Sequence, residues 1–410
     1  MSAGFERPVP GWALHDATEW QGFRGHAEAL ARPESVEEVA EVLARCAAGG
    51  VPVAVRGGGT GLAGGCVPDG GVVLSLERLA SVRSVVPEER RMVVEAGVTT
   101  ARVARVAREN GLHFGVDPGA AEQSHVGGNV ATNAGGPHTH GSGPMRDWVA
   151  GLEVVLASGA VVRTASDAPR DVAGYDLTAL ICGSEGTLGV ITAVDLRLAP
   201  AAAAAPVWTA TFADAAAGAA AALEVTGAAV LDFLDGGALA ATGRGGAGFL
   251  LIGEGGDMPG GAVVADDPAA VWRWRSGVSH AVAAAHGGKL SEDVAVPRAR
   301  LAEMVDGVVA IGARHGLEAC SWGHAGDGIV HATFLAAPAE AARALPAAEE
   351  VFDLALSLGG SLSGEHGLGR LKAHRAAAAL GPGRVAALRA IKAALDPAGI
   401  LNPGVKLPPA

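Results

Sequence analysis

The 410-residue sequence has few cationic side chains, few cysteines and no long apolar runs. It holds 31 Lys and Arg against 43 Asp and Glu, which gives a formal net charge of −12. A protein that binds nucleic acid needs clustered Lys and Arg to replace counterions. The acidic balance therefore argues against a nucleic-acid partner, and an anionic substrate would require cations gathered locally.

The sequence also lacks the cysteine spacing that binds metals and the apolar segments that insert into a membrane. The four cysteines stand singly, so neither an iron–sulfur cluster nor a cysteine-based zinc site is expected. No apolar run reaches the ~18 residues of a membrane span, and residues 1–8 hold no hydrophobic signal segment. We therefore expect no integral membrane span and a reduced, cytoplasmic setting.

Apolar side chains and glycine are abundant. Hydrophobic residues make up 49% and charged residues 18%, a mixture that excludes a disordered chain. The length predicts two or three domains. The 61 glycines are about twice the usual ~7% and follow no collagen period. Such a density indicates tight turns or close approach of the backbone to a ligand.

Apolar periodicity predicts a mixture of strands and helices up to residue 200. Ser35 and Glu38 form a capping box that opens a helix over 35–48. The other elements expected in this part are strands at 51–55, 72–76, 92–96 and 189–198, a helix at 100–110 and a hairpin over 152–164. The Pro- and Ala-rich stretch at 200–206 predicts a linker. Beyond it we expect short strands, a helix over 297–315 and a helix near 382–395.

A glycine-rich loop follows the strand predicted at 51–55. Gly59, Gly61 and Gly64 satisfy G-x-G-x-x-G, the spacing of the Rossmann dinucleotide site. That site also needs a helix to begin at once, and the glycines and proline at 65–71 prevent one. Two interpretations stay open. The segment is either a plain turn cluster or a loop whose backbone N–H groups bind a diphosphate without a helix.

Two further tracts of small residues favour the ligand-binding interpretation. The first runs from Asp117 to Ala120 and continues at 127–136, and the second spans 182–191. Small residues in such tracts allow the backbone to approach a flat, large ligand along its length. Each tract alone could be a structural turn, but three within 190 residues make that less expected.

Two histidines flank an Asp-Gly pair in the segment 321–334. If Asp327 and Gly328 form a two-residue hairpin loop, His324 pairs with His331 and their Cβ atoms lie roughly 5 Å apart. Two imidazoles at that spacing can chelate a divalent metal. The alternative is a pair of partly exposed strand histidines.

A second polar cluster follows at 363–372. Glu365 could complete a site of two histidines and one carboxylate, and His366 beside it could accept a proton. The alternative is a polar turn between helices. A third cluster, Trp272-Arg273-Trp274-Arg275, offers a guanidinium for bidentate carboxylate binding or, alternatively, exposed cations on a strand edge.

Taken together, these motifs resemble the FAD-linked D-2-hydroxyacid dehydrogenases, a branch of the vanillyl-alcohol-oxidase superfamily. That branch includes D-lactate dehydrogenase, the glycolate oxidase large subunit and D-2-hydroxyglutarate dehydrogenase. The resemblance implies an α+β fold, with a PCMH-type FAD-binding domain of two α+β subdomains over 1–199. It also implies an antiparallel-sheet-and-helix cap domain for the substrate over 200–355, and a C-terminal segment at 356–410 that returns to the FAD domain.

The resemblance also implies roles for individual residues. The residues expected to bind FAD, non-covalently because 56–65 lacks histidine, are Arg56, Gly57, Gly58, Gly59, Thr60, Gly61, Leu62, Gly64, Pro118, Gly119, Gly127, Gly128, Asn133, Glu185, Gly186, Gly189, Ile191 and Asn402. His324, His331 and Glu365 are the implied ligands of zinc or manganese. His366 is the implied base, and Arg275, Ser279 and Lys289 are implied to hold the substrate.

Two departures from the family pattern leave the substrate open. The family usually has Asn at the position of Ile329 and a Lys-Tyr pair at the position of Gly141-Ser142. We expect a small hydroxy acid as substrate, oxidised by hydride transfer to flavin with an unidentified electron acceptor. The alternatives are a flavoenzyme for a different alcohol and a non-catalytic flavin subunit of a complex. The oligomeric state stays open, with a homodimer as one option.

Overall fold

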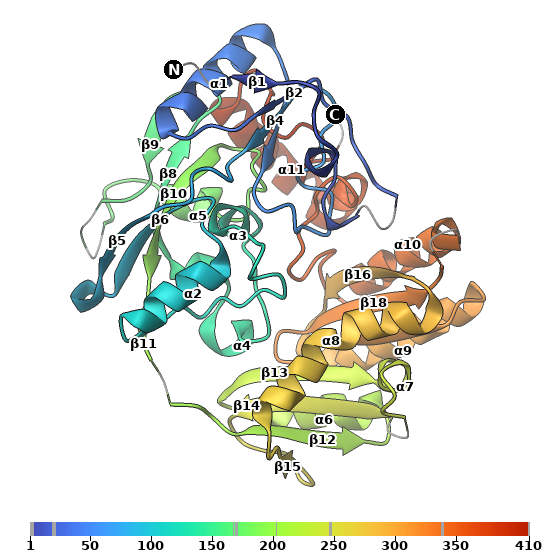
Figure 1. Cartoon of the computed structure of the whole chain (residues 1–410). Coiled ribbons are helices and arrows are strands. Elements are labelled where there is room, and N and C mark those ends of the chain that lie inside the picture. The colour runs from blue at the N-terminus through green and yellow to red at the C-terminus, as the bar shows by residue number, and fades with distance from the viewer. Residues whose placement is uncertain are drawn as a thin grey trace. The chain divides into compact units, whose positions relative to one another are not determined.

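The computed structural model describes residues 4–18, 22–166, 168, 171–201, 203–245, 248–337 and 340–408. The chain divides into two compact units, whose elements are labelled in Figure 1. The first unit comprises residues 1–136, 143–202 and 366–410, and the second comprises 137–142 and 203–365. These units are defined by packing. The assignment of FAD and substrate binding to the domains 1–199, 200–355 and 356–410 stays a prediction.

The first unit holds a small sheet of four strands. Its order is β1 (Phe5–Glu6), β2 (Ala29–Ala31), β4 (Val72–Ser75) and β3 (Val53–Arg56). β3 and β4 are parallel neighbours, yet residues 57–71 between them form no helix. A Rossmann unit requires a helix at this connection. The structure therefore agrees with the rejection of the Rossmann fingerprint at Gly59–Gly64.

A second sheet of the first unit has five antiparallel strands. Their order is β5 (Val82–Val86), β6 (Arg91–Glu95), β10 (Val190–Arg197), β8 (Val149–Val155) and β9 (Val161–Arg163). β8 and β9 form the predicted hairpin. The linker prediction is wrong at its first residue, because Ala199–Pro200 form β11, which pairs with β7 (Leu112–His113).

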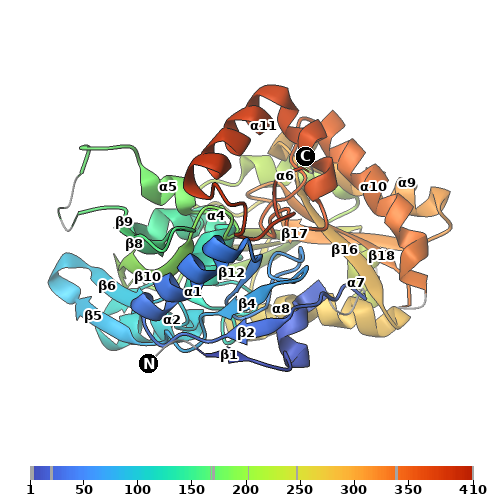
Figure 2. The same cartoon turned by 90° about the horizontal axis from the view of Figure 1, so that it is seen from above.

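The helices of the first unit begin with α1 (Val36–Gly49), as predicted. The side chain of Ser35 accepts a hydrogen bond from the Glu38 amide, and Val39, Val42 and Leu43 are buried. Figures 1 and 2 both show α1 beside the four-stranded sheet. The remaining α-helices are α2 (Thr100–Glu109), α3 (Val126–Thr132), α5 (Leu177–Ile181) and α11 (Ala376–Leu395). Short 3-10 turns lie at 11–14, 87–89, 145–148 and 373–375.

The second unit is built on a sheet of seven antiparallel strands. Their order is β15 (Val263–Val264), β12 (Val207–Phe212), β14 (Phe249–Gly255), β13 (Ala228–Asp235), β17 (Ala319–His324), β18 (Ile329–Leu335) and β16 (Lys289–Ala295). Since side chains alternate along a strand, each face of this sheet receives every second residue. Direct strand partners, such as Asp232 and His324, therefore share a face.

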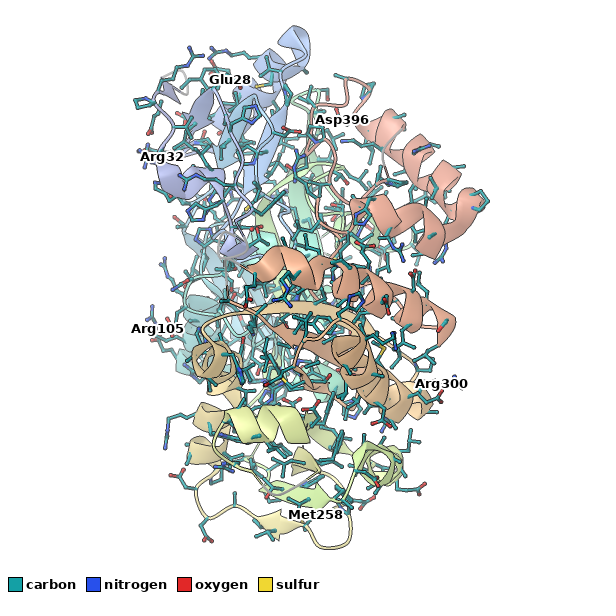
Figure 3. The ribbon with its side chains drawn as sticks, turned by 90° about the vertical axis from the view of Figure 1, so that its right-hand side faces the viewer. Glu28, Arg32, Arg105, Met258, Arg300 and Asp396 are labelled. Atoms are coloured by element: carbon teal, nitrogen blue, oxygen red, sulfur yellow. The ribbon has the colours of Figure 1, made fainter. Side chains whose placement is uncertain are left out.

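Helices pack against both faces of this sheet. α7 (Gly236–Ala241) and α8 (Pro268–His286) cover the face that carries Leu250 and Ile252. α6 (Ala215–Glu224) packs on Phe249, which points to the other face. The other helices are α4 (Thr139–Ser142), α9 (Leu301–Arg314) and α10 (Ala341–Ser357). Figure 3 shows Arg300, which ends the 3-10 turn at 298–300, directed away from the sheet beside the start of α9.

Three observations on the helices bear on the sequence predictions. Residues 272–275 belong to α8, so the alternative of a strand edge is wrong, although one of the two cations, Arg273, is exposed. The helix predicted over 297–315 is observed as a 3-10 turn followed by α9. Among the described residues, no helix combines the length and the apolar composition needed to cross a membrane.

Candidate functional site

His324 and His331 lie on one face of the β17–β18 hairpin, but the predicted register is wrong. His324 pairs with Ile329 and Trp322 pairs with His331, so the loop has four residues, 325–328, in place of two. The register differs from the prediction by two residues, and a shift of two keeps every side chain on its face. The two histidines are therefore diagonal neighbours, with ring centroids 5.7 Å apart.

Glu365 reaches the same point from the loop after α10. Its Oε1 atom lies 3.4 Å from His331 Nε2 and 3.8 Å from His324 Nε2. One ligand atom from each of the three side chains falls within 4.8 Å of the others. Both histidines are buried, at 5% and 8% exposure. Two imidazole nitrogens and one carboxylate oxygen form a donor set suited to zinc or manganese.

Asp232 on β13 orients His324, although none of the predicted sites includes it. His324 Nδ1 donates to Asp232 Oδ1 over 2.7 Å, which leaves Nε2 directed at Glu365. Burial opposes protonation of His324, but the carboxylates of Asp232 and Glu365 outweigh it and raise the pKa of His324 to about 10. The available sequence signal is one carboxylate in the otherwise apolar run 228–234.

Asp293 on β16 holds the turn that carries Glu365, and it too is absent from the predicted sites. One carboxylate oxygen of Asp293 accepts from the backbone amides of Gly364 and Glu365, both at 2.7 Å, and from the Ser363 hydroxyl at 2.9 Å. Asp293 is fully buried. Three hydrogen bonds to a single oxygen fix the backbone at Glu365, from which its side chain extends toward the two histidines.

The three residues predicted to hold substrate lie on or beside α8. Arg275 is buried, and its Nε atom donates to Asp232 Oδ2 over 2.6 Å. Lys289 on β16 donates to the Ser279 hydroxyl over 2.5 Å and lies 4.6 Å from the centre of the Trp322 ring. Burial lowers the pKa of Lys289 to about 8. The structure thus brings Arg275 to the histidine cluster through Asp232, and it pairs Lys289 with Ser279.

The family departures lie in the second unit as well. A side chain at Gly141 would meet the backbone of Ala229 at 2.7 Å, so the helix α4 packs directly on β13. In the segment 138–142, His140 Nδ1 lies 3.2 Å from Asp327 Oδ1, and His138 Nε2 lies 3.4 Å from Glu254 Oε2. The hydrogen bond from His138 lowers the pKa of Glu254. These two histidines directly precede the positions of the absent Lys-Tyr pair.

In the first unit, the glycines of the three tracts separate into two kinds. Some are required by the protein itself. A side chain at Gly58 would lie 2.2 Å from the Gln123 carbonyl, and Gly59 and Gly64 have φ of +69° and +72°. Others have no such reason, namely Gly61, Gly65, Gly119 and Gly128. A Cβ at Gly61 would meet only Asp16 at 3.6 Å, and the other three would meet nothing within 4 Å. These four glycines leave open space where a large ligand can approach the backbone.

Several predicted FAD residues form contacts within the first unit. Arg56 is buried, with its guanidinium donating to the His15 carbonyl over 2.5 Å. Glu185 accepts from the amides of Leu368 and Gly369, at 3.1 and 2.7 Å. Asn402 accepts from the Val55 amide over 2.7 Å. Arg56 and Asn402 thus brace the strand β3 and the loop after it, and Glu185 braces the loop at 367–369.

The remaining predicted residues take up three kinds of position. Gly127, Gly186 and Gly189 lack space for a side chain, because a Cβ would lie 2.5–2.7 Å from Ala96, Asn402 and Val154, respectively. Ile191 is buried in β10, and Asn133 ends α3 with φ +53°. The predicted FAD residues that lie in loops and are partly or fully exposed are Gly57, Thr60, Leu62 and Pro118. The implied base, His366, is partly buried and begins the C-terminal part of the first unit.

Comparisons with known families cover most of the chain. Residues 27–165 match the family described as "FAD binding domain", and residues 252–405 match "FAD linked oxidases, C-terminal domain". Glycolate oxidase subunit GlcD of Bacillus subtilis is 34% identical, over 95% of this chain and 90% of that protein. D-lactate dehydrogenase of Archaeoglobus fulgidus is 33% identical, over 92% and 90%.

Two further comparisons extend the family and the fold. The mitochondrial D-2-hydroxyglutarate dehydrogenase of Bos taurus is 31% identical, over 99% of this chain and 83% of that protein. The solved structure of p-cresol methylhydroxylase with substrate bound shares the fold, with a TM-score of 0.76 at 18% identity over 97% and 90% of the two chains. The expected family and PCMH-type fold are confirmed. This chain belongs to the FAD-linked oxidoreductases of the glycolate oxidase, D-lactate dehydrogenase and D-2-hydroxyglutarate dehydrogenase type.

Proposed function

We propose that this chain is an FAD- and divalent-metal-dependent dehydrogenase of a small 2-hydroxy acid. The observation that carries the proposal is the convergence of His324, His331 and Glu365 on one point, with ligand atoms within 4.8 Å of one another. The buried carboxylates of Asp232 and Asp293, which hold His324 and the Glu365 turn, add to it. Metal-binding histidines usually donate their second ring nitrogen to such a carboxylate.

The side chains of this cluster would have distinct tasks. A zinc or manganese ion held by His324, His331 and Glu365 would lower the pKa of a substrate hydroxyl. Arg275 would orient the substrate carboxylate, because a guanidinium matches its two oxygens. Lys289 and Ser279 would bind a further polar group of the substrate. His366 would accept the hydroxyl proton, as a positioned imidazole does in general base catalysis.

The glycine tracts would hold FAD non-covalently, and the cofactor would take the hydride from C2 of the substrate. The glycines with open space above them, Gly61, Gly119 and Gly128, fit a ligand that lies against the backbone. We assign FAD binding to residues 1–199 and 356–410, and substrate binding to 200–355. A cytoplasmic location and an unidentified electron acceptor complete the proposal.

A different alcohol is the second candidate substrate, and the segment 138–142 favours it. Ile329 and Gly141-Ser142 replace the Asn and the Lys-Tyr pair usual in this family, while His138 and His140 add ionisable groups to the same segment. Changed polar groups at these positions would change which substrate is bound. A non-catalytic flavin subunit is a weaker candidate, because such a subunit has no use for a metal-ligating set.

The experiment combines metal analysis with flavin reduction. The purified protein is incubated anaerobically with a panel of D- and L-2-hydroxy acids, and flavin absorbance is followed before and after treatment with a strong chelator. We expect bleaching by one enantiomeric series and loss of bleaching on chelation. Glu365→Ala should lose metal, and added metal should partly restore the rate. His366→Ala should keep metal and FAD but reduce flavin about 10²–10⁴-fold more slowly.

A matched control is His315→Gln. His315 lies at the end of α9 and pairs with Glu350 over 2.7 Å, away from the ligand set, so this variant should keep metal and rate. Absence of metal together with a chelator-insensitive rate would refute the metal-dependent mechanism. Metal loss in His366→Ala, with a near-normal rate once metal is added back, would mean that the roles of Glu365 and His366 are reversed.

A further inference from the structure

We propose that Asp232 is a positioning residue that couples the metal ligand His324 to the anion-binding Arg275, so that metal affinity and carboxylate affinity change together. This inference rests on the proposed function of both partners. Nothing in the sequence motifs singles out Asp232, because it belongs to none of the glycine, histidine or arginine clusters.

The geometry gives each oxygen of Asp232 one partner. Oδ1 accepts from His324 Nδ1 over 2.7 Å, and Oδ2 accepts from Arg275 Nε over 2.6 Å. The carboxylate has no exposure to solvent. Asp232 and His324 are direct partners on the adjacent strands β13 and β17, while Arg275 reaches the same face from α8. One buried group thus joins three separate elements.

The chemistry of the group explains why the two partners depend on each other. An ionised carboxylate only accepts hydrogen bonds, so it holds the proton of His324 on Nδ1 and keeps Nε2 available toward Glu365. The same charge holds the guanidinium of Arg275 by its Nε atom. If either partner moves, the carboxylate must rotate, and the other partner loses its orientation.

Asp235 on the same strand provides a matched control. It is also buried, but its partners are backbone amides, among them those of Ala238 at 2.8 Å and Ser321 at 2.6 Å. Its carboxylate therefore caps α7 and touches neither the histidine cluster nor Arg275. Replacing Asp235 should cost stability without a specific effect on ligand affinity.

The test uses the full-length FAD-loaded protein, first depleted of metal by chelation. Cobalt(II) is titrated by calorimetry and by its visible absorption bands, and oxamate is titrated separately into the metal-free protein. In Asp232→Asn the amide nitrogen cannot accept a hydrogen bond, so one partner is lost. We expect cobalt to bind about 10- to 100-fold more weakly, with an altered absorption band, and oxamate to bind about tenfold more weakly.

Arg275→Gln tests the same coupling by changing the second partner of Asp232. Arg275 is not a ligand in the proposed site, yet the coupling predicts that this variant weakens cobalt binding several-fold. Asp235→Asn should leave both affinities near wild type while lowering the melting temperature. Melting curves and FAD content show whether each variant is folded. If Asp232→Asn does not fold, Arg275→Gln alone still decides.

The outcomes separate this inference from the function on which it rests. Suppose that the wild-type protein binds cobalt and oxamate, and that cobalt affinity is unchanged in Asp232→Asn and Arg275→Gln. This result would overturn the coupling and leave the proposed function intact. Wild-type protein that binds no cobalt would overturn the metal site and the coupling with it. Equal losses in Asp232→Asn and Asp235→Asn would also overturn it, because the effect would then be one of stability.

Discussion

At the scale of single residues, Lys289 shows how burial changes the chemistry of a side chain. It lies on β16 under α8, where it donates to Ser279 and stacks over Trp322. Burial disfavours its charged form and lowers its pKa from the ordinary 10.5 to about 8. An amine with this pKa can change its charge in mildly alkaline solution, and its protonation state becomes linked to the stability of the fold.

Lys289→Met should therefore change the pH dependence of stability. Between about pH 8 and 10.5 the unfolded chain keeps a proton that the folded chain has lost, so this group makes stability rise with pH across that window. Below pH 8 the full cost remains, at most about 3.5 kcal/mol at ~1.4 kcal/mol per pKa unit. Chemical unfolding at pH 7 and pH 10 should show the stability difference between variant and wild type shrinking at the higher pH. An equal difference at both pH values would contradict the assignment.

At the scale of elements, the loop 57–65 combines glycines with two different purposes. Gly58 is needed because its neighbour, the Gln123 carbonyl, leaves no room for a side chain. Gly61 has ordinary φ and open space around it. A sequence pattern cannot separate these purposes, because both appear as glycine. The distinction predicts that substitutions at the two positions will fail in different ways.

Gly61→Val should fold and lose FAD, because the new side chain meets only the Asp16 carboxylate at 3.6 Å but occupies the space above the loop. Gly58→Val should lose stability and FAD together. Gly260→Val, at an exposed site in the second unit with nothing within 4 Å, serves as the control that keeps both. Melting temperature and flavin absorbance are the two measurements. A yellow Gly61→Val protein with wild-type affinity for FAD would show that this glycine lies away from the cofactor.

The β17–β18 hairpin shows a second limit at this scale. Asp327-Gly328 predicts a two-residue turn, yet the chain uses a four-residue loop. Gly328 has φ +69°, and a side chain there would lie 2.0 Å from the Val296 carbonyl, which belongs to the segment after β16. Packing of the loop against that segment thus accompanies the longer turn. The two-residue difference left both histidines on the predicted face because strands alternate with a period of two.

At the scale of the whole molecule, the first unit joins chain segments that are far apart in sequence. Its C-terminal stretch returns to β3, and Asp396 anchors the turn after α11, as labelled in Figure 3. The Asp396 carboxylate accepts from the amides of Ile400 and Leu401, at 3.1 and 2.8 Å. Asn402 then bridges the Val55 amide and the Glu185 carbonyl, both at 2.7 Å. The C-terminal segment that contains Asn402 thereby connects the strand before the first glycine tract with the tract at 182–191.

Asn402→Ala should lower the melting temperature and weaken FAD binding together. The substitution leaves the Val55 amide and the Glu185 carbonyl without this partner, at about 1–3 kcal/mol for each buried group. Asn110→Ala, which removes a side-chain hydrogen bond on the exposed surface of α2, should have little effect on either property. Thermal shift and fluorimetric FAD titration test this, and unchanged values in Asn402→Ala would mean that the tail does not support the loops.

The α+β fold and the shared face of His324 and His331 could be predicted from the sequence, because both depend on local spacing and alternation and not on distant partners. The family was indicated by the resemblance of the glycine, histidine and arginine motifs. The hairpin register and the hydrogen-bond partners of Asp232 and Asp293 became apparent only in the folded structure. Asp232 meets His324 across 92 residues and Arg275 across 43, so its meaning depends on which strands and helices are neighbours. The sequence of an apolar strand does not show which partners its one buried carboxylate will have. The function of that carboxylate is set by the donors that the fold brings to its two oxygens.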